Sequence, residues 1–406
     1  MTRRRVVVTG CGVVSALGEN AADTWAGLLA GRVGIGPITL FDASRDRTHT
    51  AAQAIEPARA DLLLGAKDRR RASRGDRLGL LAAFEAVWDA GLELVRIDRR
   101  RAGVFLGGGG SGLPQAEEYV RTLHVRGTAR PTLAYGFFPA VTAGRIATAL
   151  GFGGPATTLT NACSSSTIAI GLGAEAIAAG GLDVALAGGA EPLSRTTFSG
   201  FNALRLVDPD PCRPFDRDRH GLSLGECGAF LLLEGRDRAL RRSARIYAEV
   251  AGHGMSADGH HPTAPDPTGD GMARAMRAAL RAAGVRPQEV DHVNAHGTGT
   301  AQNDRAEARA IHAVFGERAP SIPVVSIKGM VGHCLGAAGA IEAFAAVMSL
   351  HEQVIPPTAG LTAPDSDCAL DLVHGAARRA PLAVALSNSA AFGGNNGSLV
   401  LRRHAS

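Results

Sequence analysis

Cys163 is the side chain whose sequence context most strongly suggests chemistry. It lies in the segment TNACSSS at residues 160–166, between an apolar approach and an Ala/Gly-rich run that ends near residue 181. This order predicts a thiol on a sharp turn from a strand into a helix. A free thiol has a pKa of about 8.5, and the roughly half positive charge of a helix N-terminus favours the thiolate, which is the nucleophile. A small buried cysteine that only packs is the alternative.

Two glycine-rich segments further along the chain carry histidines. Residues 294–300 read NAHGTGT and contain His296, and residues 328–339 read KGMVGHCLGAAG and contain Lys328 and His333. A neutral imidazole offers an N–H group without a permanent charge, so two of them suit the stabilisation of a developing oxyanion. Glycines would let both loops approach a narrow site closely. Either histidine alone would more often be a structural hydrogen-bonding group, and their pairing favours catalysis.

The composition disfavours several other classes of protein. The 406 residues are 45% hydrophobic, and the net charge of +5 is dispersed, unlike the concentrated charge of a nucleic-acid binder. The six cysteines form no CxxC pair, so neither a metal site nor a disulfide framework is expected. Glycines interrupt the apolar run after the basic N-terminus, and no stretch has the length of a membrane helix. We expect a soluble, cytoplasmic protein without membrane contact.

Alternating strand and helix patterns indicate an α/β fold. Short apolar runs recur at residues 5–9, 102–106, 184–187, 229–234, 290–294, 324–326 and 382–387. Helical patterns separate them, so we expect buried, largely parallel strands. Residues 160–190 and 326–355 share the order strand end, sharp turn, small-residue helix and strand, which suggests an internal duplication. We place the halfway point in the charged stretch 236–243, giving halves of residues 1–240 and 241–406.

Four segments together resemble those of the β-ketoacyl-[acyl carrier protein] synthases, especially the elongating condensing enzymes of fatty-acid and type II polyketide assembly. They are the segments around Cys163, His296 and His333 and the C-terminal NSAAFGGNNG at residues 388–397. The resemblance runs nearly end to end. It implies a thiolase-like fold of five layers, α-β-α-β-α, with two pseudo-symmetric halves. It also implies an acyltransferase that condenses an acyl-Cys enzyme with malonyl-[acyl carrier protein], with loss of carbon dioxide.

The resemblance assigns roles to the residues of the first three segments. Cys163 would hold the acyl group, and His296 and His333 would stabilise the enolate. This Cys-His-His set differs from the Cys-His-Cys of thiolases and the Cys-His-Asn of priming condensing enzymes. Lys328 would tune the histidines, with Glu307 as the acidic residue that accompanies it. An ordinary structural ion pair between these two residues is the alternative.

The resemblance also implies how thioesters are held. The backbone N–H groups of Cys163 and Phe392 would form the oxyanion hole, and the two glycines after Phe392 could let its side chain gate the pocket. Thr298 and Thr300 match positions that hydrogen-bond the phosphopantetheine arm, although hydroxyls in a glycine-rich loop could equally cap a turn. That arm would be supplied by the acyl carrier protein, and no cofactor bound to this chain is expected.

The glycine-rich loop 107–112 satisfies a dinucleotide-binding pattern, which we reject because no acidic ribose partner ends the next strand. The resemblance assigns this loop to the acyl pocket, where fatty-acid members carry a bulky aliphatic residue near Gly110. Ala390 and Ala391 stand where those members tend to have Phe-Gly. We therefore expect a roomy acyl channel, with Phe201 and Phe392 as its main bulky side chains, and a role in secondary metabolism. The alternative is that other side chains close the space.

A set of basic residues is expected to dock the acyl carrier protein. The set, called the basic cluster below, comprises Lys67, Arg70, Arg71, Arg74, Arg130 and Arg205. A solvated helix start in an arginine-rich chain is the alternative, since only two of the 43 basic residues are lysines. The resembled family forms two-fold dimers, and the sequence leaves open a homodimer and a heterodimer with a chain-length-factor-like homologue. A non-catalytic or chain-length-determining partner subunit is the alternative function, and its signature would be a lost nucleophile.

Overall fold

The computed structural model describes residues 3–55 and 58–404, and its main feature is a sheet of 11 strands. These strands are β1 (Val6–Val14), β4 (Ala102–Gly107), β5 (Ala156–Leu159), β6 (Val184–Glu191), β7 (Cys227–Gly235), β8 (Ala248–Ala257), β9 (His292–Asn294), β10 (Pro323–Val325), β12 (Asp371–Leu372), β14 (Val384–Ser389) and β15 (Asn395–Arg403). Their order across the sheet is β12-β10-β9-β14-β15-β8-β1-β7-β6-β4-β5. Two small ladders lie apart from it, formed by β2 (Ile35–Pro37) with β3 (Thr50–Ala52) and by β11 (Val354–Ile355) with β13 (Arg378–Arg379).

The two ends of the large sheet repeat one pattern of pairing. In the order β5-β4-β6-β7-β1 the first two pairs are parallel and the next two antiparallel. The order β10-β9-β14-β15-β8 shows the same succession. The two sets meet where β1 pairs with β8 at Val7–Glu249 and Val8–Ala248. This repeat confirms the expected duplication.

We propose residues 1–240 and 241–406 as the two halves of the chain. Helix α9 (Arg236–Arg241) supports this division because it lies between β7, the last strand of the first set, and β8, the first strand of the second.

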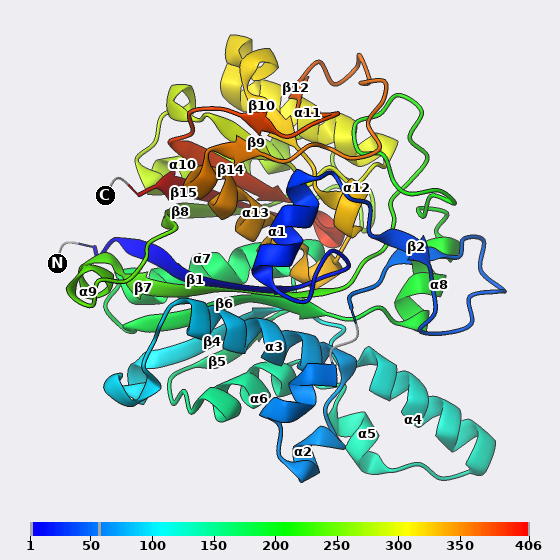
Figure 1. Cartoon of the computed structure of the whole chain (residues 1–406). Coiled ribbons are helices and arrows are strands. Elements are labelled where there is room, and N and C mark those ends of the chain that lie inside the picture. The colour runs from blue at the N-terminus through cyan, green and yellow to red at the C-terminus, as the bar shows by residue number, and fades with distance from the viewer. Residues whose placement is uncertain (1–2, 56–57, 405–406) are drawn as a thin grey trace.

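Helices form three layers around the two sets of strands (Figure 1). The main ones are α3 (Arg74–Asp89), α6 (Ala140–Leu150), α7 (Ser165–Ala178), α10 (Asp270–Ala283), α11 (Ala301–Phe315) and α13 (Ala338–Glu352). Helices α7 and α13 pack against each other and against strands of both sets, so they form the middle layer. Helices α3 and α6 cover one outer face, and α10 with α11 covers the other. The predicted α-β-α-β-α order is therefore present.

Small residues allow the middle layer to pack closely against its neighbours. A Cβ atom on Gly107, at the end of β4, would lie 2.2 Å from the backbone nitrogen of Ser166 in α7. A Cβ atom on Gly339 would lie 2.0 Å from the hydroxyl of Thr167. Both distances are far below van der Waals contact, so only glycine lets these elements meet. Among the described residues, no helix combines the length and apolar character needed to cross a membrane.

Candidate active site

Cys163 lies on the sharp turn that the sequence predicts. It is in the 3-10 turn η4 (Ala162–Ser164), directly before α7, and its side chain is buried. Ala162 has a φ of +48°, a left-handed conformation that residues other than glycine rarely adopt. Leu335 has the same φ at the start of η7 (Leu335–Ala337), directly before α13. The strained turn therefore occurs once in each half, and the first copy presents the thiol.

Burial and nearby charges act on the protonation of the Cys163 thiol. Burial raises its pKa to about 12, and the nearby charge of Lys328 offsets this only in part. Burial thus opposes the preference for the thiolate that the helix N-terminus provides. The Sγ atom lies 2.9 Å from Nε2 of His333, and the backbone N–H of Phe392 donates a hydrogen bond to it. A proton acceptor and a hydrogen-bond donor thus stand beside the sulfur.

The two imidazoles are buried and uncharged. Their ring centroids lie 5.2 Å apart with planes at 85°. Burial lowers the pKa of His296 and of His333 well below the usual value, and the charge of Lys328 lowers both further. Lys328 Nζ lies 3.3 Å from Nδ1 of His296. Because an ammonium only donates, this Nδ1 accepts, and the ring proton of His296 is on Nε2.

The carboxylate that forms an ion pair with Lys328 is Glu342, so the alternative of an ion pair between Lys328 and Glu307 is wrong. The Lys328 ammonium forms an ion pair with Glu342, and both side chains are 1% exposed. Glu307 instead accepts hydrogen bonds of 2.8 Å from two successive backbone N–H groups of the loop that carries His296. The sequence could have indicated a buried role for Glu342, because it is a single acidic residue in the otherwise apolar start of α13. A buried charge in such a helix requires a partner.

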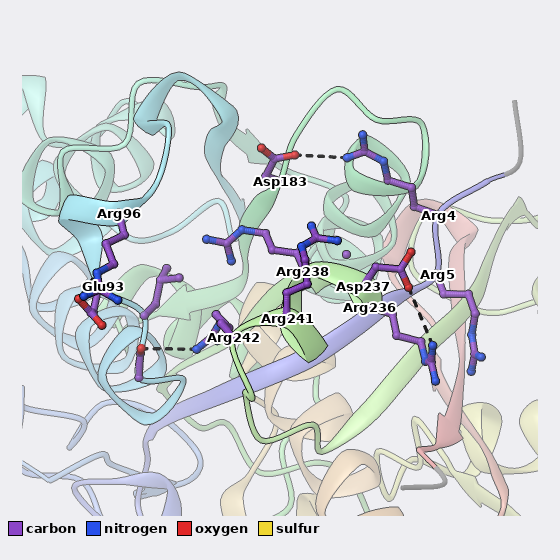
Figure 2. A pocket seen from close by; sticks show the side chains of 13 residues that line it. Arg4, Arg5, Glu93, Arg96, Asp183, Arg236, Asp237, Arg238, Arg241 and Arg242 are labelled. Atoms are coloured by element: carbon purple, nitrogen blue, oxygen red, sulfur yellow. Dashed lines mark hydrogen bonds and ion pairs between the residues drawn. The ribbon is translucent and has the colours of Figure 1, made fainter.

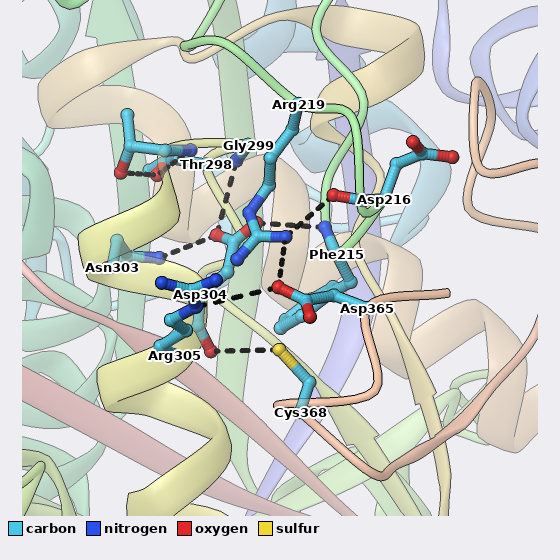
Figure 3. A network of polar contacts seen from close by, with 12 residues as sticks. Phe215, Asp216, Arg219, Thr298, Gly299, Asn303, Asp304, Arg305, Asp365 and Cys368 are labelled. Carbon is cyan, nitrogen blue, oxygen red and sulfur yellow. Dashed lines mark hydrogen bonds and ion pairs between the residues drawn. The ribbon is translucent and has the colours of Figure 1, made fainter. Parts of the chain in front are cut away.

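A second buried network supports the loop that carries Thr298 and Thr300 (Figure 3). Asp304 accepts a hydrogen bond of 3.2 Å from a backbone N–H of this loop and forms an ion pair of 3.2 Å with Arg219. Arg219 also binds Asp365 at 2.7 Å. No sequence motif pointed to these three residues, which come from separate segments. Glu307 thus holds the loop at His296, and Asp304 holds it between Thr298 and Thr300.

The cavity beside Cys163 is small, with a volume of about 60 Å³. Its lining includes most of the predicted catalytic and substrate-binding residues, namely Cys163, Phe201, His296, Thr298, Thr300, His333, Ala390, Ala391 and Phe392. Phe201 and Phe392 stack with ring centroids 5.4 Å apart and planes at 13°. The hydroxyls of Thr298 and Thr300 lie 2.9 Å apart. The fold therefore brings together residues from both halves around one thiol.

Gly110 is not among the residues that line this cavity, and the space beside it is filled. A Cβ atom at position 110 would lie 2.2 Å from a carboxylate oxygen of Glu191 and 3.1 Å from Leu113. Glu191 is buried, accepts a 3.2 Å hydrogen bond from the backbone of Gly109, and has its pKa raised by burial to about 7. The roomy channel expected beside Gly110 is thus wrong for this structure, and other side chains close the space.

The basic cluster does not lie wholly on the surface. Its exposed members are Arg70, Arg71, Arg130 and Arg205. Arg74 instead turns inward and binds the buried carboxylate of Glu226 at 2.6 Å. Because its charge is already paired inside the protein, Arg74 is removed from the expected docking surface. The side chain of Lys67 lies outside the described part of the structure.

Comparison with known proteins establishes the family. The sequence-family model of the β-ketoacyl synthase N-terminal domain matches residues 3–239, and the family model of the C-terminal domain matches residues 247–362. The chain belongs to the β-ketoacyl synthase family. This synthase is 40% identical over 414 residues to the 3-oxoacyl-[acyl-carrier-protein] synthase 2 of Coxiella burnetii, and 99% of each chain is covered.

Solved structures show the same fold. The ishigamide ketosynthase/chain length factor matches with a TM-score of 0.95 and 38% identity, over 99% of this chain and 100% of that chain. A chain of the AntDE:AntF complex, a type II polyketide acyl-carrier protein with its ketosynthase bound to the hexaketide, matches with a TM-score of 0.90 and 31% identity, over the same shares. The predicted thiolase-like fold and the predicted family are confirmed.

Proposed function

We propose that this synthase elongates an acyl chain by decarboxylative Claisen condensation, using Cys163 as the acyl carrier and malonyl-[acyl carrier protein] as the extender. The observation that carries the proposal is the contact of 2.9 Å between Cys163 Sγ and His333 Nε2, with a second neutral imidazole, His296, facing the same cavity. This set supplies a nucleophile and two uncharged imidazoles within one closed site.

Acyl transfer is the first step. The sulfur of Cys163 attacks the carbonyl carbon of an acyl thioester, the new C–S bond forms, and the C–S bond to the phosphopantetheine arm breaks. The proton of the Cys163 thiol passes by way of His333 to the departing thiolate. The backbone N–H of Phe392, which hydrogen-bonds the sulfur in the resting site, is placed to stabilise the oxyanion together with the N–H of Cys163.

Decarboxylation and condensation follow in the same cavity. The bond between the malonyl carboxylate and the α-carbon breaks, carbon dioxide leaves, and the electron pair forms an enolate whose oxygen carries the charge. His296 offers its Nε2–H to this oxygen, because Lys328 occupies the other ring nitrogen. The enolate carbon then attacks the acyl-Cys carbonyl, a C–C bond forms, and the C–S bond to Cys163 breaks. The sulfur leaves as a thiolate and takes up one proton from solvent, because its original proton left with the thiol of the phosphopantetheine arm. The product is β-ketoacyl-[acyl carrier protein].

The partner in this proposal is an acyl carrier protein that brings both acyl groups on its phosphopantetheine arm, with Thr298 and Thr300 contacting the arm. The names of the Coxiella burnetii relative and of the AntDE:AntF complex both include an acyl-carrier protein. The exposed arginines of the basic cluster support docking, since Arg205 directly precedes Leu206, which lines the cavity. A homodimer and a heterodimer with a chain-length-factor-like homologue both fit, as does a cytoplasmic location.

A non-catalytic, chain-length-determining subunit is the less favoured function. Such a subunit needs no nucleophile, whereas this chain keeps Cys163, both histidines and the buried Lys328–Glu342 pair that adjoins them. A polyketide or fatty-acid pathway accommodates the same chemistry.

The test is elongation with purified protein, an acyl carrier substrate and malonyl-[acyl carrier protein], followed by mass spectrometry of the carrier-bound product. Cys163→Ala should abolish condensation, and Cys163→Gln should leave malonyl decarboxylation measurable because the histidines perform that step. Cys11→Ala is the matched control, since it removes a buried cysteine that does not line the cavity. Full elongation by Cys163→Ala would end the nucleophile assignment.

A further inference from the structure

A second and larger cavity, of about 770 Å³, lies among arginines away from Cys163 (Figure 2). Its walls are the segment before β1, the connection after α3 and helix α9. Seven arginines line it against three acidic residues. None of the residues lining the Cys163 cavity, and no member of the basic cluster, contributes to it. It is therefore separate from the proposed condensation site and from the expected docking surface.

Two of these arginines are held in fixed positions by a single carboxylate. Arg238 and Arg242 both bind Glu234, whose side chain is fully buried in β7. Arg242 also donates a 2.8 Å hydrogen bond to the carbonyl of Ala90. Burial lowers the pKa of Arg238, and the charge of Arg242 lowers it further. Two cations thus share one anion at the cavity wall, and their mutual repulsion is relieved by further negative charge.

Other arginines of the cavity have unused hydrogen-bonding capacity. Among the described residues, the side chain of Arg236 forms only a long ion pair of 3.9 Å with Asp237, and its buried Nε atom has no hydrogen-bond partner. Within the described part of the chain, the side chain of Arg241 has neither a hydrogen bond nor an ion pair. Arg96 pairs with Glu93, but both side chains are largely exposed, and such surface pairs hold little energy. Figure 2 shows Arg96 and Arg236 at opposite sides of Arg238 and Arg241. Free donors therefore surround the hollow.

These features fit an extended phosphate-bearing anion. The planar guanidinium group presents paired N–H donors that match phosphate oxygens. Cavities of roughly 300–1,000 Å³ hold small molecules, and one phosphate group does not reach arginines on several walls of such a hollow. We propose that this cavity binds a small oligophosphate, an anion with two or more linked phosphate groups. The linked phosphates belong to a nucleotide-type molecule or to an inorganic chain.

Calorimetric titration of the intact protein tests this site. The probes are pyrophosphate, tripolyphosphate and ADP, with orthophosphate as the single-phosphate comparison, all at physiological salt. The test variant is Arg236→Gln with Arg241→Gln, which leaves the Glu234 pairs intact. The matched control is Arg281→Gln with Arg379→Gln, which removes the same charge from exposed positions outside the cavity. Circular dichroism and condensation activity, expected unchanged in both variants, verify folding.

We expect saturable binding of pyrophosphate, tripolyphosphate or ADP to the native protein. The affinity of the test variant for these probes should be about tenfold or more lower, and orthophosphate should bind the native protein about tenfold or more weakly than they do. The control variant should bind as the native protein does. If ADP binds more tightly than tripolyphosphate, the ligand is of the nucleotide type. If tripolyphosphate binds more tightly than ADP, the ligand is an inorganic chain. The proposal is overturned if no oligophosphate saturates the protein, if orthophosphate binds equally well, or if both variants lose affinity equally, because net charge would then explain the result.

Discussion

Replacing Glu342 by Gln tests whether the buried ion pair with Lys328 sets the electrostatics of the catalytic histidines. The substitution keeps the shape of the side chain and removes its charge. Lys328 would retain its contacts with the carbonyl oxygen and Nδ1 of His296. Its ammonium would then be buried without its ion-pair partner. The variant therefore perturbs the charge next to the histidines while leaving the residues that line the cavity in place.

The structure sets the expected size of the effect. Both partners are 1% exposed, so solvent screens their interaction little. Removing one partner of such a pair costs about 3–5 kcal/mol of unfolding free energy. Desolvation disfavours the protonated lysine once its partner is neutral, and an uncharged amine does not attract the enolate. We expect malonyl decarboxylation to slow by at least about tenfold, which corresponds to about 1.4 kcal/mol of activation free energy.

Two measurements check this prediction. Chemical denaturation gives the loss of stability, and the rate of carbon dioxide release from malonyl-[acyl carrier protein] gives the catalytic loss. Glu352→Gln is the matched control, because it is the same substitution at the exposed end of the same helix. The buried pair does not have this role if Glu342→Gln has the unfolding free energy and the decarboxylation rate of the native protein. The same conclusion follows if Glu352→Gln is as impaired as Glu342→Gln.

Three further outcomes are expected. Arg70→Glu with Arg71→Glu should raise the apparent KM for the carrier substrate and flatten its salt dependence, and unchanged kinetics across a salt series would contradict docking there. Gly110→Ile should displace the Glu191 carboxylate, because one of its oxygens would lie 2.2 Å from the new Cβ atom, and lower the free energy of unfolding by about 1–3 kcal/mol. A selective loss of long acyl primers with unchanged stability would instead show that the acyl channel passes this position. His292, whose pKa burial lowers to about 4, stays neutral in the folded chain while the unfolded chain binds a proton below its usual pKa. Stability should therefore fall as pH drops from about 6.5 to 4, by on the order of 3 kcal/mol from this residue, and urea unfolding of His292→Gln should show a shallower decline.

The sequence by itself determined the features that depend on local backbone geometry and on residue size. The turn at Cys163 could be predicted because the small residues that begin a helix follow directly after a short strand. Gly297, Gly299 and Gly332 have φ values of +34°, +85° and +65°, so the loops around both histidines require them. Helices α7 and α13 are apolar on nearly every face, which marks them as the layer between two sheets.

Only the tertiary structure decided which charged groups meet. The ion-pair partner of Lys328 is Glu342, Arg74 binds Glu226 inside the protein, and Glu191 fills the space beside Gly110. Each of these outcomes depends on where side chains from distant segments point after packing. The pKa of Cys163 is of the same kind, because burial, which no local sequence specifies, raises it to about 12.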